Sequence, residues 1–152
     1  MGDILIRPYK EQDWSRIEEI HDEARKIELN LAGLDDSFIP LIEAAESEGL
    51  FDYDVCVALD NDHVVGFAAY TEDELAWLYV DPSCMRQGIG KTLIKYAIQH
   101  IAHRPIELEV LVGNEPAVRL YESLGFKLIK TISGVMPGNE LFKVNVHCME
   151  LN

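Results

Sequence analysis

The feature that most constrains the fold is a repeated change of hydrophobic period along the 152 residues. Short apolar runs of the kind found in strands are interspersed with segments whose apolar residues recur every three or four positions, as in amphipathic helices. The expected strands cover 4–7, 55–59, 64–70, 75–80, 106–112, 126–132 and 142–149, and the expected helices cover 14–31, 37–48, 88–103 and 116–124. This order predicts an α/β fold, with a mixed sheet and helices on its faces.

Length and composition indicate one folded domain covering residues 1–152. The chain is 48% hydrophobic and 26% charged, as in ordinary globular proteins, and it contains no repeat or linker. Its apolar runs are shorter than the roughly 20 residues of a membrane span, and it opens without a basic and then apolar leader. Three cysteines without CxxC spacing suggest neither a disulfide framework nor a zinc site. We expect a cytoplasmic domain that binds no metal.

The net charge of −14 is concentrated in the first half of the chain. Residues 1–80 hold 20 acidic and 5 basic side chains, whereas residues 81–152 hold 7 and 8. An acidic surface repels nucleic-acid phosphates and anionic membranes, so we expect neither as a partner. Either the charge simply keeps the protein dispersed, or the acidic half attracts a cationic acceptor while an anionic cofactor binds to the second half.

A glycine-containing turn lies directly between an apolar strand and an amphipathic helix. It consists of Arg86, Gln87, Gly88, Ile89, Gly90 and Lys91. The start of a helix offers unpaired backbone N–H groups and the positive end of a dipole, and glycines let a diphosphate approach the backbone closely. The turn therefore predicts an anion-binding site.

Two other phosphate-binding motifs are excluded at this turn. Its tail Gly90-Lys91-Thr92 matches that of a P-loop, but Met85 stands where that motif requires glycine. A dinucleotide fingerprint would require a further glycine where Leu93 stands.

The segment 75–93 instead resembles the GNAT superfamily of N-acetyltransferases, in which an apolar strand precedes such a turn. A second motif resembles the family's later signature; it comprises Asn114, Ala117, Leu120, Tyr121, Glu122, Leu124, Gly125 and Phe126. The resemblance implies the family's mostly antiparallel central sheet. Met85 departs from the Arg or Gln usual at its position, but the backbone site does not depend on that side chain.

The resemblance also implies where acetyl-CoA binds. Its pantetheine arm is expected between the strands ending at Val80 and Val112, against backbone near Leu78, Tyr79 and Val80, with an N–H near Leu78 stabilising the oxyanion. The motif positions Asn114, Ala117 and Tyr121 are expected beside the cofactor. Asn114 also has a simpler reading as the N-cap of its helix.

Catalytic roles follow from the same resemblance. Tyr121 is the expected general acid beside the cofactor sulfur; its alternative role is that of a core aromatic. Glu74 is the expected base at the start of its strand, with Glu72, Asp73 and water as rivals, and the acidic trio can also be read as a solvated turn.

The predicted function is therefore acetyl transfer from acetyl-CoA to the primary amine of a small molecule by direct attack in a ternary complex, and the charge distribution leaves open whether that acceptor is cationic. The acceptor pocket is expected around 29–39 and 133–139. Alternatives are an acetyltransferase acting on peptide N-termini or lysines, or a non-catalytic acyl-CoA sensor. Leu111 follows Glu109 and Val110, where the ribosomal-protein type of the family has arginine, which disfavours that type. Homodimer formation is left open.

Overall fold

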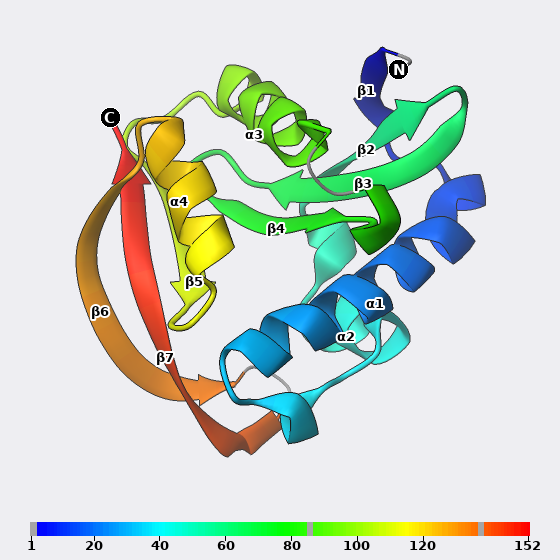
Figure 1. The fold of residues 1–152 in the computed structure, drawn as a ribbon. Helices are drawn as coiled ribbons and strands as arrows, with labels where there is room; N and C mark the ends of the chain where they lie inside the picture. Colours follow the sequence, from blue (N-terminus) through cyan, green and yellow to red (C-terminus); the bar gives the residue numbers. More distant parts are fainter. Residues whose placement is uncertain (1–2, 85–86, 137–138) are drawn as a thin grey trace.

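The computed structural model describes residues 3–84, 87–136 and 139–152, which form an α/β fold of antiparallel sheets flanked by helices (Figure 1). The strands are β1 (Ile4–Pro8), β2 (Asp54–Asp60), β3 (His63–Tyr70), β4 (Leu75–Val80), β5 (Ile106–Leu111), β6 (Lys127–Met136) and β7 (Asn139–Leu151). The helices are α1 (Trp14–Leu31), α2 (Leu41–Ser47), α3 (Ile89–His100) and α4 (Glu115–Ser123). The predicted fold class is confirmed.

The sheet is divided in its middle. One half has the strand order β1-β2-β3-β4 and the other has the order β5-β7-β6, and neighbouring strands in each are antiparallel. Between β4 and β5, the structure shows only a parallel bridge that joins Glu74 to Glu107 within the described residues. Beyond this bridge the two strands diverge.

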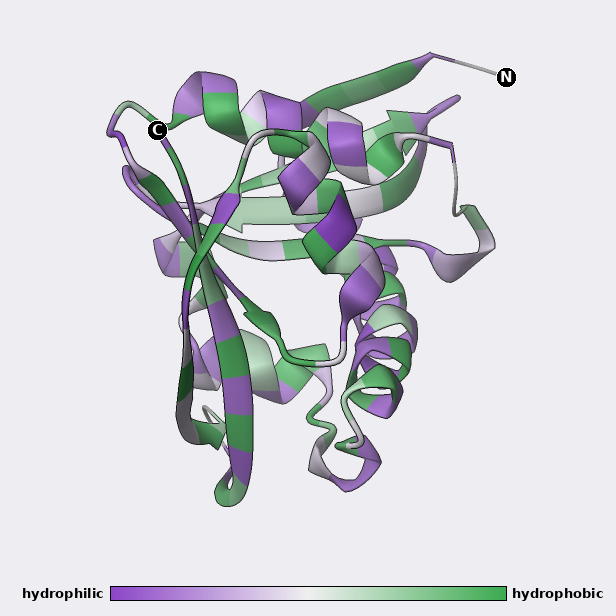
Figure 2. Ribbon diagram, turned by 60° about the vertical axis from the view of Figure 1, so that its left-hand side comes forward, coloured by the Kyte–Doolittle hydropathy of each residue, from purple (hydrophilic) through white to green (hydrophobic). Residues whose placement is uncertain are grey.

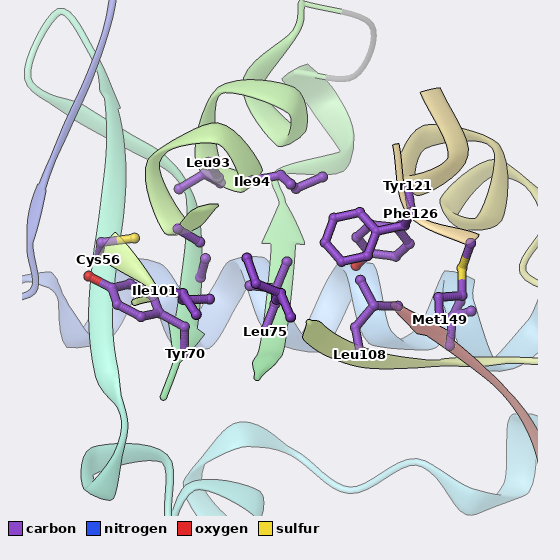
Figure 3. Packing of buried hydrophobic residues seen from close by; sticks show 14 of the residues in the cluster. Cys56, Tyr70, Leu75, Leu93, Ile94, Ile101, Leu108, Tyr121, Phe126 and Met149 are labelled. Atoms are coloured by element: carbon purple, nitrogen blue, oxygen red, sulfur yellow. The ribbon is translucent and has the colours of Figure 1, made fainter. Parts of the chain in front are cut away.

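Helices cover both faces of the first half-sheet because its strands alternate their buried side chains. In β2, Cys56 and Ala58 belong to the apolar cluster under α3, whereas Val57 and Leu59 belong to the cluster under α1 and α2. Figure 3 shows part of the α3 cluster, which extends to α4 through Tyr121. Each fully buried aliphatic side chain contributes about 1.5–3 kcal/mol, so both faces hold α1 and α3 in place.

Two helix boundaries differ from the sequence expectation. Helix α2 begins at Leu41 rather than Ser37, because its N-cap Pro40 is extended and disfavours helical backbone before it. The first N–H of the helix donates to a carboxylate of α1, with 2.9 Å between Leu41 N and Asp22 Oδ1. The start at residue 37 that the sequence predicted is therefore wrong. Helix α3 ends at His100 instead of continuing to 103, because the next residue already has extended backbone angles.

The C-terminal hairpin is longer than predicted. The interval between the expected strands 126–132 and 142–149 is largely strand, since Gly134 pairs with Val144 and the next residue with Lys143. Cross-strand pairing along β7, which also pairs with β5, outweighs the turn propensity of a single glycine. Figure 2 shows the alternation of hydrophilic and hydrophobic residues along this hairpin. Pro137 and Gly138, which belong to the same interval, lie outside the described residues.

Candidate functional site

The divergence of β4 and β5 exposes a strand edge at the position predicted for the pantetheine arm. Asp81 N–H donates to Val65 O at 2.8 Å, on the β3 side of the sheet. Because successive residues of a strand direct their N–H groups to opposite edges, those of Leu78 and Val80 face β5. Tyr79 pairs with β3 in this register, and its ring lies on the α1 face.

The predicted diphosphate site lies at the start of α3. Gly88 is the N-cap, with φ of +75°, a left-handed conformation that favours glycine. The turn is closed by Thr92, whose N–H and hydroxyl both donate to Gly88 O, at 3.0 and 2.8 Å. The N–H groups of Ile89, Gly90 and Lys91 in this first turn therefore have no partner within the helix. Gln87 and Lys91 are exposed beside them. Arg86, which the sequence also assigned to this site, lies outside the described residues.

Asn114 is the N-cap of α4, as the simpler sequence reading predicted. Its Oδ1 accepts from Ala117 N–H at 3.4 Å, and its amide nitrogen donates to Glu28 Oε2 at 3.2 Å. Glu28 also accepts from the Tyr79 hydroxyl at 3.3 Å and pairs with Arg25. The carboxylate of Glu28 thus links α1 to β4 and to the start of α4.

The start of α4 is also held to α1 by close backbone packing. Gly113 has φ of +107°, and a Cβ there would lie 2.7 Å from Leu31 O and 3.0 Å from Ala32 Cα. No other residue can be accommodated at this position without moving α1. This contact fixes the distance between α1 and the loop that carries Asn114.

Tyr121 lies in the core beside the divided strands. It is 8% exposed, and its ring packs edge to face on Phe126, with ring centroids 5.8 Å apart (Figure 3). Burial raises the pKa of Tyr121, and the charge of Glu28 adds to this shift. The phenol therefore stays protonated well above neutral pH and is available as a hydrogen-bond donor.

Glu74 lies at the bridge that closes the divided strands. It lines a pocket of about 170 Å³ together with Glu48, Tyr53, Glu109 and neighbouring residues of β4. Burial raises the pKa of Glu74, and the nearby carboxylates, first of them Glu109, add to the effect. The rivals Glu72 and Asp73 are exposed in the preceding turn.

A larger pocket of about 330 Å³ adjoins the smaller one and shares Glu48, Ala76, Trp77 and Glu109 with it. It lies between α1, the segment before and within α2, β4, β5 and the β6–β7 hairpin. The two segments expected to form the acceptor pocket both contribute to its lining, through Ser37, Ile39, Gly134, Val135 and Met136. The hairpin is tied to this region by Asn139, whose side chain donates to Ser37 O at 3.2 Å.

Most of the polar lining of the larger pocket was not predicted from the sequence. His21 and Arg25 reach it from α1, and Glu48 and Glu109 reach it from the other side. One signal was present: His21 is a polar residue on the otherwise apolar face of α1. Its position marked it as buried, but only the tertiary structure places a pocket beside it.

Neither a metal-binding cluster nor a membrane-spanning helix occurs in the described part of the chain. Within the ranges 3–84, 87–136 and 139–152, no three His, Cys, Asp or Glu side chains gather closely enough to hold a metal ion. In the same ranges, no helix has the length and hydrophobicity to cross a membrane.

The divided antiparallel sheet, with the start of α3 on one side and the larger pocket on the other, has the fold of acetyltransferases of known structure. Residues 14–126, most of the chain, match the model of the Acetyltransferase (GNAT) family, and the chain therefore belongs to that family. The resemblance inferred from the two motifs is confirmed.

Individual relatives are more distant. The chain is 35% identical over 71 residues, 46% of its length, to a peptidyl-lysine N-acetyltransferase of Escherichia coli, YiaC, and the match spans about half (47%) of that relative. An N-acetyltransferase structure from Staphylococcus aureus Mu50 has a TM-score of 0.75 at 21% identity, with 99% of both chains covered. A putative acetyltransferase from Salmonella typhimurium, yncA, solved with acetyl-CoA, has a TM-score of 0.69 at 20% identity, with 98% of this chain and 93% of that chain covered.

Proposed function

We propose that the protein transfers the acetyl group of acetyl-CoA to the primary amine of a small molecule in a ternary complex. The observation that carries this proposal is the divergence of β4 and β5, which leaves free N–H groups between the open start of α3 and the larger pocket. Donor and acceptor can thus approach the divided strands from opposite faces of the sheet. Membership of the GNAT family, and the acetyl-CoA with which the structural neighbour yncA was solved, support the choice of donor.

The donor site uses backbone rather than side-chain charge. The diphosphate of acetyl-CoA binds the N–H groups of Ile89, Gly90 and Lys91 at the start of α3, where the helix dipole favours an anion. Lys91 and Gln87 are exposed at the rim, and Arg86 is assigned to the same site from the sequence. The arm then runs along the free edge of β4, where Leu78 N–H stabilises the oxyanion.

The transfer step uses two side chains on either side of the divided strands. The amine nitrogen attacks the thioester carbonyl, the C–N bond forms and the C–S bond breaks. Glu74 accepts the proton that the nitrogen loses, and Tyr121 donates a hydrogen bond or proton to the departing sulfur. Asn114 and Ala117 contact the pantetheine arm; the second amide hydrogen of Asn114 is available for this, since its Oδ1 and one hydrogen are already engaged.

The acidic lining supports a cationic acceptor. Glu48, Glu74 and Glu109 surround the smaller pocket, and the first half of the chain has a large excess of acidic residues. An aliphatic amine with a pKa near 10.4 reaches the protein as an ammonium ion, and such a lining attracts it. The raised pKa of Glu74 brings this carboxylate closer to the amine in basicity, which favours proton transfer.

A peptide lysine is the second candidate acceptor, because the relative YiaC is named as a peptidyl-lysine N-acetyltransferase. A lysine side chain is itself a primary amine on an aliphatic chain, so it satisfies the same chemistry. A thiol-release assay with acetyl-CoA and a panel of polyamines, amino sugars, free amino acids and lysine peptides separates the two. We expect release with small amines. If only peptides support thiol release, the acceptor is a peptide or protein lysine. If no acceptor supports release, the remaining candidate function is non-catalytic sensing of acyl-CoA.

A further inference from the structure

One buried polar side chain of the larger pocket has no role in the transfer step described above. His21 lies on the buried face of α1 and is only 2% exposed. Its ring packs edge to face on Tyr79, at 4.9 Å between ring centroids, and lies 6.0 Å from the ring of Trp77. A histidine in such aromatic surroundings could be a purely structural residue, so the state of its two nitrogens decides what it does.

The inner nitrogen of the ring is fixed by Asp22. Nδ1 lies 2.9 Å from Asp22 Oδ1, and the same oxygen accepts the N–H of Leu41 at 2.9 Å. A carboxylate oxygen can only accept, so Nδ1 must carry the hydrogen. The carboxylate thereby orients the imidazole and, through Leu41, ties it to the start of α2.

The outer nitrogen, Nε2, is then the unprotonated one. It makes no hydrogen bond with any described residue, while the ring forms part of the lining of the larger pocket. Nε2 is not among the side-chain atoms of the described residues that are buried without a hydrogen-bond partner, so it keeps contact with solvent. A ligand in the pocket that carries an N–H group would supply a hydrogen-bond partner.

Charged and titratable groups face His21 from several elements. They are Asp22, Arg25 and Glu28 from its own helix, Tyr79 from β4, and Glu48 and Glu109 from the other walls of the pocket. Burial lowers the pKa of His21, which outweighs the opposing effect of Asp22. The ring is therefore neutral at physiological pH and keeps its acceptor lone pair.

We propose that His21 recognises the acceptor, its Nε2 lone pair accepting a hydrogen bond from the acceptor's amine nitrogen or from a second N–H donor on the same molecule. This inference rests on the proposed function, because it assigns the larger pocket to the acceptor. His21 is distinct from Glu74, which receives the proton at the reacting nitrogen. The role predicts a pH dependence: as pH falls through the lowered pKa, the ring becomes an imidazolium that cannot accept and that repels an ammonium ion, so the acceptor KM rises.

The test compares two substitutions in the intact protein. His21→Phe keeps an aromatic ring but removes the lone pair, whereas His21→Gln keeps an acceptor oxygen near the position of Nε2. With cadaverine as the first acceptor and the panel amine of highest kcat/KM as the second, we expect His21→Phe to raise the acceptor KM about tenfold. The KM for acetyl-CoA and kcat stay within about twofold, and His21→Gln restores most of the acceptor affinity. His100→Phe, on the exposed face of α3, is the matched control and leaves both KM values unchanged.

A second measurement keeps the inference testable if His21→Phe does not fold. In protein labelled with ¹⁵N-histidine, the Nε2 resonance of His21 is identified as the one that His21→Gln lacks. We expect addition of the amine to shift this resonance in the wild-type protein. An unchanged Nε2 resonance, equal rises in both KM values, or a fall in kcat with the acceptor KM unchanged would each overturn the inference. Those results leave acetyl transfer intact, whereas an absence of thiol release with every amine defeats the proposed function itself.

Discussion

Replacement of Tyr121 by phenylalanine removes one hydrogen-bond donor and little else. The side chain is 8% exposed and packs on Phe126, and phenylalanine retains that packing. A hydrogen bond to a charged group contributes about 1.5–3 kcal/mol, so the loss of the bond to the departing thiolate lowers kcat about 10- to 100-fold. The KM for acetyl-CoA stays within about twofold, because the lost interaction belongs to the transition state.

The assay is steady-state thiol release over a range of pH. The matched control is Tyr70→Phe, since Tyr70 is also 8% exposed and belongs to the same apolar cluster. The raised pKa of Tyr121 further predicts that the wild-type rate shows no fall from phenol ionisation up to about pH 10, the ordinary tyrosine pKa. An unchanged kcat in Tyr121→Phe, or an equal loss in Tyr70→Phe, would refute this reasoning.

Three other predictions concern the base and the scaffold. Because the pKa of Glu74 is raised, the wild-type rate increases with pH, and the midpoint of this increase lies above about 4.3, the ordinary pKa of glutamate. Glu74→Gln moves the pH profile of kcat/KM to alkaline values. An unshifted profile would assign the proton to water or to another group. Asp13→Ala, which removes a buried two-point ion pair, lowers the free energy of unfolding in urea by about 2–4 kcal/mol at pH 7. The pKa of Asp13 is lowered, so this contribution is present above about pH 3.9 and disappears as pH falls through the lowered value, where equal stabilities are expected. Gly113→Ala destabilises the protein by at least about 2 kcal/mol, because Gly113 has a positive φ and the new Cβ would contact Leu31 O. The control Gly134→Ala changes stability by less than about 1 kcal/mol, because the space at its Cβ is open. Similar melting curves for the two variants would contradict this prediction.

The parts of the site that depend on local chemistry could be predicted from the sequence. The start of α3 follows from two glycines between an apolar strand and an amphipathic helix, and Asn114 was placed correctly as an N-cap because such caps involve neighbours in the chain. The burial of Tyr121 was foreseen as one of two alternatives, and the structure is compatible with both, since a core ring can still present its hydroxyl to the cofactor.

The remaining features depend on contacts between distant segments. The division of the sheet follows from β5 pairing with β7 rather than fully with β4, which no local pattern encodes. The start of α2 was misplaced because the local signal, Pro40 as N-cap, was not used, and because the carboxylate that accepts the first N–H of the helix, Asp22, lies nineteen positions earlier. His21 is a further example. Its position on the apolar face of α1 predicts that it is buried, but the pocket beside its ring is formed by distant segments of the chain.

The measurement that tests the proposed donor site most directly is a titration of the ¹⁵N-labelled protein with acetyl-CoA, followed by amide NMR. We predict that the largest downfield shifts fall on the amide protons of residues 88–91, where diphosphate oxygens accept hydrogen bonds, and that pantetheine, which lacks the diphosphate, shifts β4 but not this turn. Unperturbed amides at the start of α3 in the presence of saturating acetyl-CoA would contradict this assignment.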